Sequence, residues 1–148
     1  MATYDELFLS IYRTNRLFQR AYTQVLDEFE LTYLQHMCLV IIHKRHEAKL
    51  MDIGHVLDLS SNTLTPVIEK LVAKKWLIKA RSQSDQRINV LKIAPEKAAE
   101  MQAMLTAVDD MREALITRLD KPLDLLLAEN QKLNQTIADL MAEKRGEK

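Results

Sequence analysis

Residues 60–93 read SSNTLTPVIEKLVAKKWLIKARSQSDQRINVLKI, and this stretch decides the fold. It begins with hydroxyls and an amide, and then places an apolar side chain at every third or fourth position, which predicts an amphipathic helix. Two strand-like runs follow, at 76–79 and 88–93, joined by a short tip that carries charged and hydroxyl side chains. The stretch therefore predicts a polar-fronted helix followed by a two-stranded hairpin.

Charge is distributed unevenly along the chain. The 148 residues carry 21 basic and 21 acidic side chains, yet residues 60–97 hold eight lysines and arginines against three acidic residues. Such an excess attracts an anionic polymer, although a basic helix face is also often only solvated surface. A helix that begins with short donors, followed by a basic hairpin, is how a winged helix reads DNA. We therefore take a DNA-binding regulator as the first hypothesis.

The rest of the chain is predicted to be mostly helical and about one domain long. Only two glycines and three prolines occur in 148 residues, and helix-forming side chains dominate. In the third helix we expect Ile53, Val56 and Leu57 to face inward, and Gly54 to allow close approach of a neighbouring helix. The expected helices cover 5–29, 32–44 with Thr32 as N-cap, 51–57, a fourth from Ser60 or Ser61, 95–119, and a sixth from Pro122.

Apolar stripes at both ends of the chain predict a homodimer. The last helix has a seam with the 3, 4, 3, 4, 3 spacing of a heptad pattern, and a packed intrachain helix would produce the same stripe. The first and last helices, however, exceed what a small winged helix needs for its own core. Asn130 is the candidate for setting the register. The seam consists of Leu123, Leu126, Asn130, Leu133, Ile137 and Leu140.

Several strings give the chain a family likeness. LTYLQ begins the second helix at 31–35, SNTLTP begins the fourth at 61–66, and RSQSDQR at 81–87 contains an Asp-x-Arg signature. Together with the order of elements, these strings resemble the MarR family of winged helix-turn-helix transcriptional regulators. The resemblance implies a single MarR-type domain over 1–148. In that domain 31–94 would form the DNA-binding lobe, and 1–30 and 95–148 would form the dimerisation helices.

The pattern is most similar to the OhrR branch of that family, the organic-peroxide sensors, with one departure. That branch carries a reactive cysteine near the start of the first helix, and Phe8 stands at the matching position here. A phenyl ring cannot form a sulfenate, so peroxide sensing is not carried over. The tyrosines that surround the sensing site are matched by Tyr12, Tyr22 and Tyr33. With Phe8, they are the candidate binding site for a small apolar or phenolic effector, in a cleft between the first, second and fifth helices.

The start of the fourth helix carries the candidate base-reading residues. Short hydroxyls and an amide at a helix N-terminus bind phosphate through the dipole and reach base edges. Asn62 is the candidate for reading adenine, and Thr63 or Thr65 for contacting a thymine methyl. Alternatively, the two serines only cap the helix and Thr65 bonds back to its own turn. Lys70 is expected to contact phosphate or solvent. The candidates on this helix are Ser60, Ser61, Asn62, Thr63, Thr65 and Lys70.

The hairpin tip supplies the remaining DNA-binding candidates, Arg81, Ser82, Asp85 and Arg87. Arg87 is expected to enter the minor groove, where narrow A·T-rich stretches concentrate negative potential. Asp85 would act as a brace, pairing with an arginine to hold the tip in shape. The alternative is an ordinary exposed turn.

The single cysteine and the four histidines are the remaining candidates for a sensing site. Because Cys38 is the only cysteine, an intrachain disulfide is excluded. It lies within an apolar run, so we expect its thiol to be buried, with a raised pKa and little reactivity. A redox role for it remains an alternative. His36, His43, His46 and His55 offer no fourth ligand for structural zinc. We expect them to be surface or capping residues and assign no metal or cofactor.

Catalysis and membrane insertion find no support in the sequence. There is no Gly-rich phosphate loop and no nucleophile elbow, so we do not expect an enzyme. The longest apolar run, 37–42, is too short to span a bilayer, and no leader pattern opens the chain, so a soluble cytoplasmic protein is expected. The sequence thus predicts a homodimeric regulator, most simply a repressor, on a pseudo-palindromic operator. An oxidant- or metal-responsive regulator, or a helical interaction module that has lost DNA binding, is the alternative.

Overall fold

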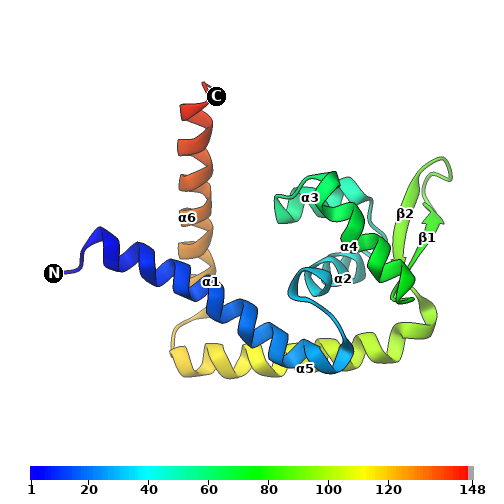
Figure 1. Cartoon of the computed structure of the whole chain (residues 1–148), viewed down its shortest axis with the longest axis horizontal. Helices are drawn as coiled ribbons and strands as arrows, with labels where there is room; N and C mark the ends of the chain where they lie inside the picture. Colours follow the sequence, from blue (N-terminus) through cyan, green and yellow to red (C-terminus); the bar gives the residue numbers. More distant parts are fainter. Residues whose placement is uncertain (147–148) are drawn as a thin grey trace. The chain divides into compact units, whose positions relative to one another are not determined.

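The computed structural model describes residues 1–146 and is mostly helical, with one small β-hairpin (Figure 1), which confirms the predicted fold class. The chain divides into two compact units, Met1–Val108 and Asp109–Lys148, which are described separately. The elements are α1 (Tyr4–Leu26), a 3-10 turn (Asp27–Phe29), α2 (Tyr33–Arg45), α3 (Leu50–Leu57), α4 (Ser61–Ala73), β1 (Leu77–Arg81), β2 (Asn89–Ile93), a second 3-10 turn (Pro95–Lys97), α5 (Ala98–Leu119) and α6 (Leu123–Lys144).

Local sequence signals account for where the first two helices begin and end. Thr32 caps α2 as predicted, because its side chain accepts a hydrogen bond from the Gln35 amide while the Gln35 side chain accepts one from the Thr32 amide. α1 ends three residues earlier than predicted. The chain tightens into a 3-10 turn after Leu26, and Glu30 then takes a left-handed conformation with φ 56°.

The core of the first unit is built around α2. Cys38, Leu39 and Ile42 on this helix are fully buried. Removing each large apolar side chain from water contributes about 1.5–3 kcal/mol. The short α3, with eight residues, depends on this burial because a helix of that length is marginal by itself. The core also includes Leu26, Ile53, Leu64, Leu71, Trp76, Leu77, Met101, Met104 and Val108.

Gly54 lies where α3 and the following turn come into contact. A Cβ atom at this position would lie 2.7 Å from the Leu59 carbonyl oxygen and 3.4 Å from Cδ1 of Leu64 in α4. The expected close approach is therefore present, and the tighter contact is with backbone of the turn. Ile53 is buried as predicted, but the prediction for Val56 was wrong. Its side chain is 52% exposed because it lies on the outer face of this two-turn helix.

The hairpin is attached to the unit along the β2 edge. β1 and β2 pair antiparallel, from Leu77 opposite Ile93 to Arg81 opposite Asn89. Ala48, in the loop between α2 and α3, adds a third strand position, because the Ala48 amide donates to the Leu91 carbonyl (3.1 Å) and the Leu91 amide donates to the Ala48 carbonyl (2.8 Å). The hairpin is thus tied by backbone hydrogen bonds to the helix-turn-helix.

The second unit contains the end of α5 and all of α6. In the single chain none of the α6 residues, all of them described, is buried. The predicted seam is present as exposed apolar side chains, with Leu123 62%, Ile137 47% and Leu140 60% exposed. Over residues 1–146, no helix combines the length and apolar character needed to cross a membrane.

Candidate nucleic-acid interface

The first turn of α4 contains both locally bonded and outward side chains. Ser60 is the N-cap, accepting a hydrogen bond from the Thr63 amide at 3.3 Å, and its hydroxyl lies 3.2 Å from that of Thr63. Thr65 donates to the Ser61 carbonyl at 2.7 Å. Capping therefore accounts for Ser60, and bonding back to its own turn accounts for Thr65. The Ser61 and Asn62 side chains are exposed at the helix start.

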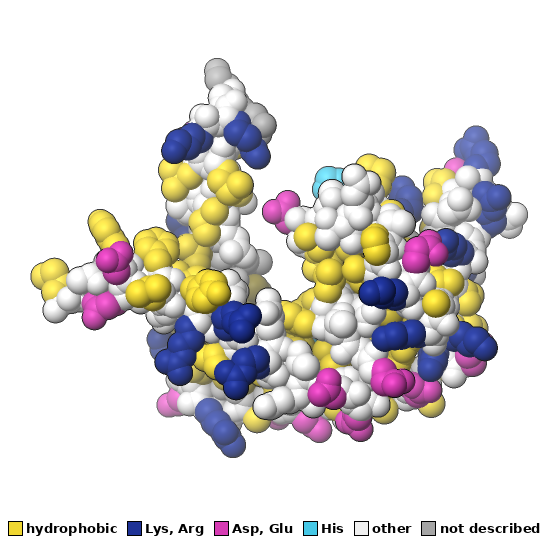
Figure 2. Space-filling model, in the orientation of Figure 1, with side chains coloured by type: hydrophobic (Ala, Val, Ile, Leu, Met, Phe, Trp, Pro, Cys, Tyr) yellow, Lys and Arg dark blue, Asp and Glu magenta, His cyan; other side chains and the backbone are white. Residues whose placement is uncertain are grey.

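Basic side chains gather over α4 and the hairpin (Figure 2). Several of them have partners within the protein: Lys74 donates to the Glu30 carbonyl, Lys79 pairs with Glu69 at 2.8 Å, and Arg87 pairs with Asp85. Lys70 and Arg81 are exposed. Because Lys79 and Arg87 pair with carboxylates, the net positive charge of this surface is smaller than the count of basic residues suggests.

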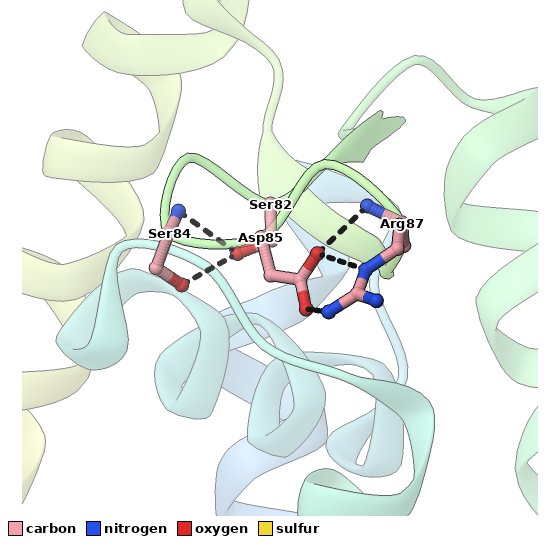
Figure 3. A network of polar contacts seen from close by, with 4 residues as sticks. All are labelled: Ser82, Ser84, Asp85 and Arg87. Carbon is pink, nitrogen blue, oxygen red and sulfur yellow. Dashed lines mark hydrogen bonds and ion pairs between the residues drawn. The ribbon is translucent and has the colours of Figure 1, made fainter.

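The hairpin tip holds Arg87 in a defined position (Figure 3). Its Nε and Nη2 atoms donate to the two carboxylate oxygens of Asp85, each at 3.1 Å, and its backbone amide donates to Oδ1 at 3.0 Å. The side chain is nevertheless 90% exposed. These bonds from Arg87 hold the pKa of Asp85 below its ordinary value and raise the pKa of Arg87. Asp85 does pair with an arginine, and that arginine is the one predicted to read DNA.

Ser82 occupies a different position from the one predicted. It is only 4% exposed, and its oxygen lies 2.9 Å from the Ser84 hydroxyl and accepts a hydrogen bond from the Ser84 amide at 3.3 Å (Figure 3). The prediction that Ser82 contacts DNA was therefore wrong, because its side chain is buried in the hairpin. Glu47 is a residue that sequence reasoning missed. Its carboxylate accepts a hydrogen bond from the Gln83 amide at 3.4 Å.

The four candidate effector-binding residues are not brought together within one chain. Tyr22 is buried and stacks on Tyr33 with ring centroids 4.4 Å apart. Phe8 and Tyr12 are 61% and 66% exposed. Phe8 precedes Tyr22 by fourteen residues of α1, which is about 21 Å along a helix axis. A cavity of about 330 Å³ lies elsewhere, between α4 and the hairpin, lined in part by Thr65.

The cysteine and the histidines take mostly structural positions. Cys38 is fully buried, and burial raises the pKa of its thiol to about 11, as expected. His36 is also fully buried and tilts against Tyr22, so the expectation of a surface position was wrong for it. His46 is the C-cap of α2, which agrees with the expectation of a surface or capping position. Within residues 1–146, no group of three or more His, Cys, Asp or Glu side chains is placed to hold a metal ion.

A model of the family described as transcriptional regulator SarA/Rot matches residues 20–104, which include α2, α3, α4 and the hairpin. The chain belongs to this family. SarA/Rot proteins are named as regulators and not as enzymes, in agreement with the sequence analysis. The chain is similar to the regulator TtmR of Methylorubrum extorquens, with 34% identity over 83 residues, and to SarZ of Staphylococcus aureus, with 29% over 82 residues. These matches cover 56% and 55% of this chain and 43% and 55% of the relatives, so the chain spans about half the length of the curated relatives it matches.

Solved structures extend the likeness over nearly the whole chain. AbfR, known from Staphylococcus epidermidis and solved in reduced form bound to DNA, is 30% identical, with a TM-score of 0.74 and 93% of each chain covered. MarR from E. coli, solved with operator DNA, has a TM-score of 0.71 over 88% of this chain and 93% of that one, and at 20% identity it shows the fold alone. This SarA/Rot chain is therefore a MarR-type winged helix. The resemblance to the OhrR branch remains a prediction.

Proposed function

We propose that this SarA/Rot protein binds double-stranded DNA as a homodimer on a pseudo-palindromic operator. α4 would lie in the major groove, with Ser61 and Asn62 at the base edges. The hairpin would follow the backbone, with Arg87 in the adjacent minor groove. A dimer places its two recognition helices about one helical turn, or ~34 Å, apart on one face of the duplex.

The observation that carries this proposal is that the start of α4 and the hairpin tip are both exposed on the same unit. An exposed helix start and an exposed guanidinium held by Asp85 belong to one unit, linked by packing of α4 against β1 (Figure 1). A preorganised side chain loses less entropy on binding than a mobile one. AbfR supports the same interpretation, since it has been solved bound to DNA.

Dimerisation is proposed from the apolar side chains that the single chain leaves uncovered. In α1 they include Leu7, Phe8 and Leu9, and in α6 they include Leu133 and Ile137. Exposed apolar side chains gathered on one helix, as on each of these two, mark an interaction site. A dimer bound across about two turns of DNA would exclude polymerase from an overlapping promoter, so we propose repression as its effect.

We also propose that a small apolar or phenolic molecule releases the DNA. Tyr22 and Tyr33 are the part of the predicted site that supports this, because their stacked rings join α1 to α2 next to the DNA-binding elements. A ligand with a few kcal/mol of differential affinity for one spacing of the two DNA-binding lobes would shift the population. The oxidant-responsive alternative is supported only by AbfR, which has been solved in reduced, overoxidized and disulfide forms.

The test is a fluorescence-anisotropy titration of the DNA upstream of the protein's own gene, against a scrambled duplex of equal length. Specific binding with a steep loss of affinity between about 50 and 200 mM salt is expected, because bound lysines and arginines release counterions from phosphate. Equal, weak binding to both duplexes would favour the interaction module instead. Adding a panel of phenolic compounds, and peroxide separately, then tests which signal releases the DNA.

A further inference from the structure

Glu47 joins the hairpin tip to a part of the molecule that is neither recognition helix nor hairpin. It lies in the loop between α2 and α3, and it is half-buried. Its carboxylate accepts a hydrogen bond from the Gln83 amide at 3.4 Å, and the Ser82 hydroxyl and Lys92 on β2 interact favourably with its charge. These contacts, the Ser82 hydroxyl first, hold the pKa of the Glu47 carboxyl below its ordinary value, so the group is ionised at neutral pH.

A short series of hydrogen bonds continues from Glu47 toward the tip. The Ser82 amide donates to the Ile88 carbonyl at 2.9 Å and closes the base of the tip. The Ser82 and Ser84 hydroxyls are 2.9 Å apart, and the next residue is Asp85, which holds Arg87 (Figure 3). Ser82 is almost fully buried at the centre of this series. A carboxylate that accepts a hydrogen bond from the Gln83 backbone amide restrains the direction in which the tip leaves the strands.

We propose that Glu47 is a positioning residue for DNA recognition, which orients the hairpin tip and through it Arg87. The inference rests on the proposed DNA binding and deepens it. Glu47 does not need to touch DNA for this role. Without it, the tip would sample several orientations, and ordering it again on DNA would cost part of the binding free energy.

The sign of the expected effect separates this role from simple electrostatics. A carboxylate near the DNA-binding surface repels phosphate, so removing its charge by itself would strengthen binding. The positioning role requires the opposite result for Glu47→Ala. We expect its affinity for the operator to fall about fivefold, the loss expected when one hydrogen-bonded link is removed. Glu47→Gln keeps an acceptor oxygen and is expected to retain most of the affinity.

Glu96→Ala is the matched control. Glu96 is exposed in the 3-10 turn after β2, and its removal makes the same charge change. We expect Glu96→Ala to bind DNA as tightly as wild type or slightly more tightly. Affinity of Glu47→Ala equal to or above that of Glu96→Ala would overturn the proposal.

A double-mutant cycle shows whether Glu47 acts through Arg87. If it does, the losses caused by Glu47→Ala and Arg87→Ala are not additive, and the double variant binds little worse than Arg87→Ala alone. Fully additive losses would mean a general loss of folding or charge, and would contradict the proposed route. Where Glu47→Ala lowers the melting temperature, the affinity of Glu47→Gln decides. Binding close to wild type supports the positioning role, and a loss as large as that of Glu47→Ala contradicts it.

Amide hydrogen exchange in the free protein keeps this inference separate from the proposed function. In Glu47→Ala the Gln83 amide should exchange at least several times faster, while the Leu91 amide, bonded to Ala48, should keep its protection. An unchanged Gln83 exchange rate overturns the positioning role even if the protein binds DNA. Faster Gln83 exchange in Glu47→Ala, together with a wild-type protein that binds no duplex, would instead refute the proposed function and leave Glu47 as a purely structural contact.

Discussion

Asp85 accepts three hydrogen bonds from Arg87, two from the guanidinium and one from the backbone amide. A guanidinium has five N–H donors, and this arrangement uses two of them. The side chain is 90% exposed, so the remaining donors face solvent while the plane of the group is fixed. The pair therefore presents a cation in one orientation at the end of the hairpin.

Arg87→Ala should weaken operator binding on the order of tenfold, because it removes the oriented cation from the tip. Thermal stability should not change, since exposed ion pairs contribute little to folding. Anisotropy titrations at fixed salt measure the first effect, and a thermal melt followed by circular dichroism measures the second. Arg13→Ala, an exposed arginine on α1, is the control and should bind normally. Equal affinities for the two variants would contradict the assignment of Arg87.

Two neighbouring substitutions should separate capping from reading at the start of α4. Ser60→Ala removes the side chain that accepts from the Thr63 amide and should lower the free energy of unfolding by about 1 kcal/mol. Asn62→Ala should leave stability unchanged and reduce the discrimination between the operator and a scrambled duplex, because its exposed amide is the candidate for base contact. Urea titrations and competition binding measure these quantities. An Asn62→Ala variant with full discrimination would show that α4 reads DNA through other side chains.

Gly54→Ala should destabilise the protein by about 1–3 kcal/mol. The new methyl group would lie 2.7 Å from the Leu59 carbonyl oxygen, which is backbone and cannot rotate away. This cost exceeds the gain in helix propensity, which is about 1 kcal/mol at most. His55→Ala, at the exposed next position of α3, is the control and should be neutral or slightly stabilising. Chemical denaturation of both variants checks the difference, and equal stabilities would contradict the close contact.

Cys38 should be unreactive in the native protein. Its thiol is fully buried, and its pKa is raised from 9.0 to about 11 because burial disfavours the thiolate. Between these two values the unfolded chain loses a proton that the folded chain keeps. The contribution to stability is therefore complete below about pH 9 and is lost as the pH rises through about 11.

A thiol-reactive chromogenic disulfide at pH 8 should modify Cys38 slowly in buffer and rapidly in denaturant. Peroxide should release DNA no more readily from the wild type than from Cys38→Ser. Rapid native labelling, together with release of the wild type alone, would restore the oxidant-responsive alternative.

Ile137→Glu should convert the protein to monomers. Ile137 lies on the exposed apolar seam of α6, and burying a carboxylate in a dimer interface without a partner is costly. Gln131→Glu makes the same kind of charge change outside the seam and should remain dimeric. Sedimentation velocity distinguishes the two states. A wild type that sediments as a monomer at micromolar concentration would contradict the homodimer.

The sequence alone identified the starts of α2 and α4 and the kind of hairpin, because these depend on residues close together in the chain. The fifth helix was predicted from residue 95, but Pro95–Lys97 form a 3-10 turn and α5 begins at Ala98. Thr32 with Gln35, and Ser60 before the apolar periodicity of α4, are complete capping signals within four residues. The pairing of Asp85 with an arginine was predicted for the same reason, since only two positions separate it from Arg87. Val56 was placed wrongly because periodicity in a two-turn helix does not specify which flank meets the core.

Only the tertiary structure determined which polar side chains face solvent and which are used inside the protein. Ser82 looks like any hydroxyl in a polar tip, yet it is buried against a carboxylate 35 positions earlier in the chain. No local pattern links Glu47 to the hairpin, because the contact arises from the path of the loop before α3. His36 likewise lies in the core through the packing of α2 against α1. Local sequence specified the elements, and long-range packing specified the positions of the functional groups.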